Sequence, residues 1–257
     1  RMFYYAYLNQ NNNDKVSLWG ERIAFLFPYD SEIIASLASH YNGANQPGRA
    51  EEAAKNYISQ CDSTNLYINK EYAYSLFMQF KYDEAIPLYE KLIAQGFDNF
   101  ESNFVLGLCY ENQPNKEEAL KHYQKAVLFK SDNATCLFHL ALAEKALNMD
   151  SLSMAHFNQS LEVSLPKDRA LRTYKWLADL HFQHSRYADA ARDFELCVLY
   201  DEEDDPLNYY NAAQMFIASK NKLKVKQHLQ MFLANANRLE DKKEAAQLIS
   251  KAKEQLK

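Results

Sequence analysis

The side chains best suited to chemistry in this chain are its histidines, and their spacing supports no reactive site. His181 and His184 are three residues apart, which places both on one face of a helix, but no third metal ligand is evident. His122, His139 and His156 are dispersed along the chain. The sequence has no phosphate-binding glycine loop, no nucleophile elbow and no HExxH motif. We therefore expect no metal, no cofactor and no enzymatic activity.

The four cysteines also stand singly and form no CxxC motif. They are Cys61, Cys109, Cys136 and Cys197. We expect each to be a small buried apolar residue rather than a ligand or a nucleophile. Unpaired thiols favour a reducing compartment such as the cytoplasm. The chain starts at Arg1, so the alternative for localisation is that an upstream anchor or targeting signal has been removed.

The bulk composition is that of a globular helical chain. With 257 residues, 47% of them apolar, it can bury a sizeable core, and five Gly and six Pro argue against a β-rich or disordered chain. The net charge of −5 gives no general attraction to nucleic acid. No run of 18 apolar residues occurs, so we expect no direct membrane insertion.

A repeat organises the elements that must position any functional side chain. Residues 66–133 contain two successive stretches that align with a shift of 34 residues. Small residues then match small ones, as Ala73 matches Gly107, and large residues match large ones, as Tyr89 matches Tyr123. A fixed period of this kind dictates the architecture of the chain.

The period and the pattern resemble the tetratricopeptide repeat, a helix–turn–helix unit of 34 residues. The resemblance implies an all-α chain, an α-α superhelix or solenoid of about six to seven such repeats with a C-terminal capping helix. The single solenoid would span 1–257, with a degraded repeat at 1–30, repeats at 31–65, 66–99, 100–133, 134–170, 171–205 and 206–239, and the capping helix at 240–257.

Two helices of one unit pack closely only where side chains are small. The small residues on first helices are Ala38, Ala73, Gly107, Ala141, Ala178 and Ala213, and those on second helices are Ala53, Ala85, Ala119, Ser153 and Ala190. The large residues beside them are Tyr57, Tyr89, Tyr123, Phe157, Phe194 and Leu229. The first repeat departs from this pattern, because Tyr4 stands at a small position and Gly20 at a large one. Either the two exchanged residues pack together, or this end is out of register.

Local signals predict several helix ends. Asp30 or Ser31 is a suitable N-cap, and Gly96 suits a left-handed C-terminal cap. Residues 42–48 predict a loop about three residues longer than the usual turn. Pro87 lies inside a helix, where we expect a mild kink on an exposed side.

The resemblance also implies a binding scaffold, in which the first helices line a concave groove that holds a peptide. The repeat phase places in that groove Tyr67, Lys70, Tyr74, Phe77, Phe104, Leu108, Phe138, Leu142, Lys145, Arg172, Lys175 and Tyr210, together with Glu101, Glu111, Thr135, Asp179, Phe182, Leu207, Gln214 and Ile217. This set is unusually aromatic for a solvent-facing surface, and exposed apolar surface often marks a partner site. The alternative is that tight curvature packs these rings against neighbouring first helices.

One subset of the family binds a peptide C-terminal carboxylate through a Lys and an Asn four residues apart. Here Lys70 is followed four residues later by Tyr74, so the resemblance does not extend to that clamp. Lys145, Arg172 and Lys175 could meet an acidic patch on a partner, or could be solvated surface charges.

The resemblance thus implies a protein–protein interaction scaffold that binds a protein or peptide in an aromatic-rich groove. Two alternatives stay open. One is a regulatory or sensor module of a larger signalling or membrane-anchored protein. The other is self-association through the aromatic N-terminal helix at residues 2–8, with the array as a structural spacer.

Overall fold

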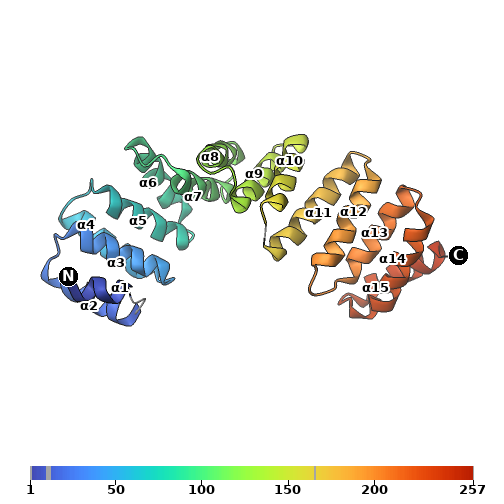
Figure 1. The fold of residues 1–257 in the computed structure, drawn as a ribbon, viewed down its shortest axis with the longest axis horizontal. Helices are drawn as coiled ribbons and strands as arrows, with labels where there is room; N and C mark the ends of the chain where they lie inside the picture. Colours follow the sequence, from blue (N-terminus) through green and yellow to red (C-terminus); the bar gives the residue numbers. More distant parts are fainter. Residues whose placement is uncertain (1, 10–12, 165, 257) are drawn as a thin grey trace. The chain divides into compact units, whose positions relative to one another are not determined.

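The computed structural model describes residues 2–9, 13–164 and 166–256, and all regular structure in them is helical (Figure 1). The predicted all-α helical-repeat class is therefore confirmed. Residues 1 and 257, which bound the first and last predicted units, lie outside the described residues. None of the described helices is both long and apolar enough to span a bilayer.

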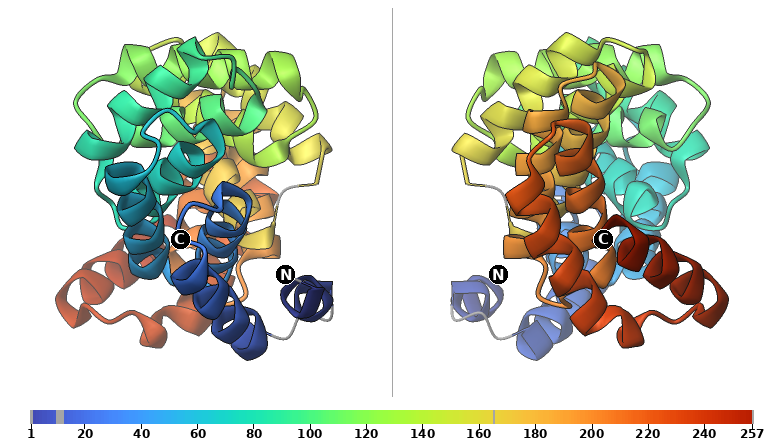
Figure 2. Two further views of the ribbon diagram at one scale, coloured as in Figure 1. Left: turned by 90° about the vertical axis from the view of Figure 1, so that its left-hand side faces the viewer. Right: turned by 90° about the vertical axis from the view of Figure 1, so that its right-hand side faces the viewer.

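The chain divides into two compact units, Arg1–Ser131 (unit 1) and Asp132–Lys257 (unit 2). Unit 1 contains α1 (Met2–Asn9), α2 (Asn13–Leu26), α3 (Ser31–Gly43), α4 (Pro47–Gln60), α5 (Leu66–Met78), α6 (Tyr82–Ala94), α7 (Phe100–Glu111) and α8 (Lys116–Phe129). Unit 2 contains α9 (Ala134–Ala146), α10 (Asp150–Glu162), α11 (Lys167–Gln183), α12 (Tyr187–Tyr200), α13 (Pro206–Ala218), α14 (Lys222–Asn235), the 3-10 helix η1 (Ala236–Arg238) and α15 (Lys242–Gln255). Within each unit, helices that follow one another in the chain pack side by side (Figures 1 and 2).

The turn inside the helix pairs repeats one backbone conformation. The left-handed residues are Asn45, Phe80, Asn148, Ser185 and Lys220, with φ of 57°, 61°, 57°, 58° and 63°. The residue after each donates its N–H to the carbonyl five residues earlier, as Lys81 does to Leu76 at 3.0 Å. This is the hydrogen bond of a Schellman motif. The α7–α8 turn differs because Pro114 occupies the position, and its ring fixes φ at a negative value.

The predicted caps are present. Asp30 caps α3 by accepting a hydrogen bond from the Ile33 N–H at 3.4 Å, and Gly96 follows α6 with φ of 100°. Helix α6 runs through Pro87, which is exposed as expected. The kink at Pro87 stays a prediction.

The longer loop expected at 42–48 is wrong. Helix α3 continues to Gly43, and Pro47 is the first residue of α4, so residues 44–46 alone connect the two helices. A proline at the first helical position costs nothing, because that N–H has no partner inside the helix.

The alternation of small and large residues forms the core of most pairs. Tyr57, Tyr89, Tyr123, Phe157 and Leu229 are buried as predicted. Two predicted core positions are wrong, since Ala53 and Phe194 are only half-buried. In α4 the side chains of Ala50 and Ala54 are buried instead. Ala50 follows Ala38 by the same 12 residues that separate Ala85 from Ala73, so α4 keeps the phase of the other second helices and the longer loop expected at 42–48 displaced the predicted position by three residues.

The exchange in the first pair packs internally. Tyr4 is fully buried, and a Cβ atom built on Gly20 would lie 3.0 Å from Tyr4 Cε2. In the α7–α8 pair the roles are reversed, because a Cβ atom on Gly107 would lie 2.6 Å from Tyr123 Cε1. The expectation that the exchanged residues of the first repeat repack against each other is thus confirmed.

The cysteines and the last helix complete the core. Cys109, Cys136 and Cys197 are buried as predicted, whereas Cys61 is only half-buried, so the prediction of burial is wrong there. In α15 the buried Ala252 packs against the cluster that holds Phe232, as a capping helix requires.

Candidate binding groove

A groove of about 490 Å³ lies in unit 1 along the helices α3, α5 and α7. Its lining includes six of the predicted groove positions, Lys70, Tyr74, Phe77, Glu101, Phe104 and Leu108. The repeat phase therefore brought most of the predicted residues of α5 and α7 to one site.

Aromatic rings form the walls of this groove. The rings of Tyr74 and Phe77 lie 5.8 Å apart on α5, and those of Phe100 and Phe104 stack at 5.5 Å with 13° between their planes on α7. Each of these four side chains is half-buried, so each keeps surface available to a ligand. Rings held at these separations gain from each other beyond the area that they bury.

The wall on α7 rests on the core of its own helix pair. The ring of Phe104 lies 6.0 Å from the buried ring of Tyr123, which in turn fills the space that Gly107 leaves open. Packing inside the pair thus fixes the position of a ring that lines the groove.

The groove also has a polar part with more acceptors than donors. Glu71 is 12% exposed and its Oε2 accepts a hydrogen bond from Asn42 Nδ2 at 3.0 Å. The same amide donates to the Glu71 carbonyl at 3.0 Å, and these two bonds fix its orientation, since a flipped amide would set oxygen against oxygen. Asn42 Oδ1 is buried and has no hydrogen-bond partner among the residues that the structure describes.

Lys70 is the cation of the groove. Its Nζ lies 3.7 Å from Glu71 Oε1 and 3.6 Å from Glu101 Oε2, which is too long for a direct hydrogen bond to either. Lys130 lies over the ring of Phe100 at 5.5 Å from the centroid.

Sequence reasoning missed Asn42, Glu71 and Phe100, which line the groove outside the predicted phase. Asn42 follows the buried Tyr41, and Glu71 lies two residues before the buried Ala73. A polar residue beside an aromatic stripe was the available signal, but it is common on any amphipathic helix.

Two predicted positions lie elsewhere. Tyr67 is 69% exposed, contacts Phe97 with 5.6 Å between ring centroids, and does not line the groove. Tyr210 in unit 2 packs on the buried ring of Phe232 at 5.0 Å, and burial raises the pKa of Tyr210.

In unit 2 two of the predicted groove residues, Phe138 and Leu142, pack in a hydrophobic cluster of the unit. Phe138 is 3% exposed and packs 5.9 Å from Phe157, so its prediction as a groove-facing residue is wrong. Leu142 is half-buried and packs on the same cluster. The alternative of packing, rather than binding, therefore holds for Phe138, while the role of Leu142 stays a prediction.

Two of the three predicted basic residues of unit 2, Lys145 and Arg172, contact other side chains of the same unit. Lys145 Nζ lies 3.3 Å from Asp179 Oδ2 and 4.5 Å above the ring of Trp176. Arg172 lies 5.9 Å from the ring of Phe138 and forms an exposed ion pair with Asp168 on its own helix. Lys175 is exposed on α11.

Several histidines that look dispersed in the sequence occupy one repeated position between paired helices. His156 Nδ1 lies 2.8 Å from the buried carboxylate of Glu144. In the next pair the acid and the base are exchanged, and His181 Nδ1 lies 2.6 Å from Asp193 Oδ2. Burial raises the pKa of Asp193, and the hydrogen bond with His181 opposes this shift.

Flanking pairs place a ring opposite the histidine instead. Tyr110 stacks on His122 at 5.8 Å, and Phe216 stacks on His228 at 5.3 Å. His184 is bound to another carboxylate, with Nε2 at 2.9 Å from Asp150 Oδ2. No group of three or more potential metal ligands occurs among the described residues.

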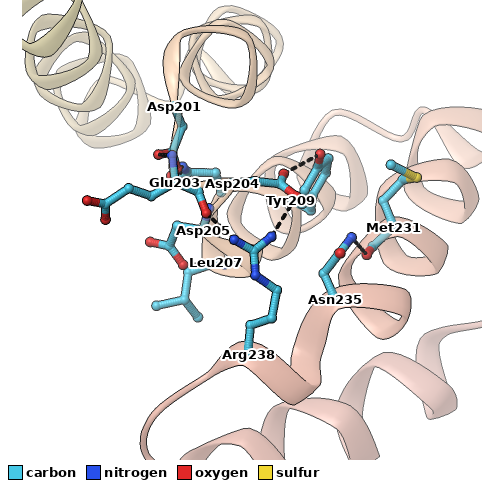
Figure 3. A network of polar contacts seen from close by, with 10 residues as sticks. Asp201, Glu203, Asp204, Asp205, Leu207, Tyr209, Met231, Asn235 and Arg238 are labelled. Carbon is cyan, nitrogen blue, oxygen red and sulfur yellow. Dashed lines mark hydrogen bonds and ion pairs between the residues drawn. The ribbon is translucent and has the colours of Figure 1, made fainter.

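A second cavity, of about 420 Å³, lies in unit 2 beside the turn before α13. A network of polar contacts lies beside this cavity (Figure 3). Arg238 Nη1 binds Asp204 Oδ2 at 2.8 Å, and Tyr209 donates to Asp204 Oδ1 at 2.8 Å. Asp201 accepts from the Asn208 amide at 2.6 Å. These bonds fix the turn before α13.

Comparisons with known proteins agree with this fold. The family model described as anaphase-promoting complex, cyclosome, subunit 3 matches residues 78–150. DnaJ homolog subfamily C member 3 of Gallus gallus is 23% identical over 173 residues, which are 64% of this chain and 34% of that protein. The match thus spans only about a third of the length of this curated relative.

Solved structures of MamA share the architecture. A crystal structure of MamA is 19% identical with a TM-score of 0.56, and the match covers 62% of this chain and 92% of that one. A MamA fragment from Desulfovibrio magneticus RS-1 is 16% identical with a TM-score of 0.58, covering 62% and 90%. At these identities the likeness shows the fold alone. With the period of 34 residues and the nested small and large side chains of its helix pairs, the chain has the fold of a tetratricopeptide repeat array.

Proposed function

We propose that this chain is a protein–protein interaction scaffold and that the groove of unit 1 binds a peptide segment of its partner. The observation that carries the proposal is the groove of about 490 Å³ lined by half-buried aromatic rings on α5 and α7. Clefts of several hundred cubic ångströms with apolar walls and a few polar groups are typical of ligand sites. Aromatic side chains are also the commonest anchors of protein interfaces.

The chemistry of the groove favours binding over catalysis. Its charged side chains, Lys70, Glu71 and Glu101, form ion pairs with one another. The three buried cysteines are poor nucleophiles, because burial raises the pKa of Cys109, Cys136 and Cys197 to about 12. The matching family model is named for a subunit of a protein complex, which fits a role in assembly.

A random peptide library panned on the immobilised full-length chain tests the proposal. We expect enriched peptides to bind the wild type and to lose binding with Tyr74→Ala or Phe104→Ala, while both variants melt close to the wild type. Tyr67→Ala is the matched control, because Tyr67 is an exposed aromatic residue on α5 that does not line the groove. Enriched peptides that ignore both groove substitutions would contradict the proposal.

Self-association through α1 is less well supported. Tyr4 is buried, and Tyr5, Tyr7 and Leu8 are half-buried in the cluster that includes Val16 of α2. The aromatic surface that motivated the idea is therefore largely used inside unit 1. The alternative of a regulatory module in a larger protein stays a prediction.

A further inference from the structure

We propose that the groove of unit 1 selects basic peptide segments and that Glu71 receives an arginine guanidinium from the guest. This inference rests on the proposed function and specifies its ligand. It follows from three features of the groove, namely its unused acceptors, its net charge and its rings.

The first feature is the surplus of acceptors. Among the described residues, the Glu71 carboxylate receives one hydrogen bond, from the Asn42 amide at 3.0 Å, although a carboxylate can accept about four. Asn42 Oδ1, which is buried beside it, receives none. The Glu71 side chain is 12% exposed, so acceptor sites of its carboxylate are open to donors of a guest. A guest that brings donors therefore fits this part of the groove.

The second feature is charge. Of the charged residues that line the groove, one is basic (Lys70) and two are acidic (Glu71 and Glu101), so the lining carries a net charge of −1. Lys70 divides its charge between both carboxylates at 3.7 Å and 3.6 Å and hydrogen-bonds to neither. The nearby Lys130 lies over the ring of Phe100 and pairs with neither carboxylate. The lining thus favours a cationic guest over an anionic one.

The third feature is the aromatic wall. The half-buried rings of Tyr74, Phe77 and Phe104 line the same groove as Glu71. A guanidinium has five donors in a planar fork, pairs with a carboxylate through two parallel bonds, and stacks on aromatic faces. Arginine therefore matches the carboxylate and the rings together, whereas an ammonium offers only a point charge.

Three fluorescent peptide libraries test the inference on the full-length chain. Each has randomised apolar flanks and a fixed central residue, which is arginine, its neutral analogue citrulline, or glutamate. Binding is measured by fluorescence anisotropy. We expect the arginine library to bind about tenfold more tightly than the citrulline library, since a hydrogen bond to a charged group is worth roughly that factor or more. The glutamate library should bind weakest.

Two isosteric substitutions give opposite expected signs. Glu71→Gln should weaken the arginine library about tenfold, because the charged acceptor is lost while the bond from Asn42 is kept. Lys70→Gln should tighten it a few-fold, because a competing cation is removed. The exposed Glu117→Gln on α8 is the matched control and should change nothing. Thermal melting of each variant verifies that the fold is retained.

The failures of the two proposals are distinguishable. If the glutamate library binds best and Lys70→Gln weakens it, the inference is overturned, while the groove remains a peptide site. If no library binds in a way that Tyr74→Ala abolishes, both the inference and the proposed function fall.

Discussion

The α1–α2 and α7–α8 pairs solve the same packing problem with the large and small side chains exchanged. In α7–α8 the first helix supplies Gly107 and the second supplies Tyr123, while in α1–α2 the first supplies Tyr4 and the second supplies Gly20. Both tyrosines are fully buried. What packing requires at this contact is therefore the combined volume, rather than a particular residue on a particular helix.

The two pairs differ in what their tyrosine supports. The ring of Tyr123 lies 6.0 Å from Phe104, which lines the groove, and its hydroxyl donates to Glu111. Tyr4 instead lies in an internal cluster with Ile33 of α3, and its hydroxyl lies 2.9 Å from Ser36 Oγ. The exchange thus preserves the core in both pairs, but only the α7–α8 pair holds a wall of the candidate site.

The largest expected difference between the two regions is in thiol reactivity. Cys109 lies on α7 in the tightly nested pair, and burial raises its pKa from 9.0 to about 12, which lowers the thiolate fraction roughly a thousandfold. Cys61 follows α4 in the N-terminal region and is only half-buried. We expect one fast thiol, Cys61, in a native titration with a disulfide reagent near pH 8, and four in denaturant. Fast modification of Cys109 would show that α7–α8 is packed more loosely than described.

Truncating the tyrosine that supports the groove comes next. Tyr123→Ala should lower the free energy of unfolding by about 3–5 kcal/mol, because it leaves a ring-sized cavity against Gly107. Tyr123→Phe keeps the ring and loses the hydrogen bond to Glu111, so it should cost about 1 kcal/mol. Urea unfolding measures both. Equal stability of the alanine variant and the wild type would contradict the repeat register.

The two glycines give a direct comparison. In Gly107→Ala the new Cβ would lie 2.6 Å and 2.7 Å from ring atoms of Tyr123, a rigid neighbour. We expect a net loss of about 1–2 kcal/mol, since overpacking outweighs the gain in helix propensity. In Gly20→Ala the closest atom is Leu37 Cδ1, the movable end of a side chain, so the two effects should nearly cancel. A larger loss at Gly20 than at Gly107 would reverse the comparison.

The sequence predicted the fold well because its signal is redundant. The same pattern recurs every 34 residues in several helix pairs, so an error at a single position such as Ala53 does not change the predicted architecture. The exchange of Tyr4 and Gly20 was also visible, since both residues break the pattern at paired positions.

The candidate site was less predictable because equivalent positions in the repeat do not have equivalent surroundings. Tyr74 and Phe104 line the groove of unit 1, whereas Phe138, at the same phase as Phe104, is buried in unit 2. The partner of Glu71, Asn42, lies 29 residues away in the sequence and on another helix pair. Contacts between neighbouring helix pairs depend on the particular side chains that meet there. A periodic pattern of small and large residues carries no information about those contacts.

The smallest expected effect compares turns rather than cores. Phe80 takes a left-handed φ of 61° in the α5–α6 turn and is 77% exposed, while Asn45 takes 57° at the equivalent position of α3–α4. A bulky residue pays more for this conformation than Asn or Gly, so Phe80→Asn should stabilise the chain by roughly 0.5–1 kcal/mol. The reciprocal Asn45→Phe should destabilise it by a similar amount, and thermal melting measures both. If Phe80→Asn and Asn45→Phe both left the melting temperature unchanged, the left-handed residue would contribute no measurable strain to these turns. The α7–α8 turn, where Pro114 replaces the left-handed residue, would then not differ from the other turns in backbone strain.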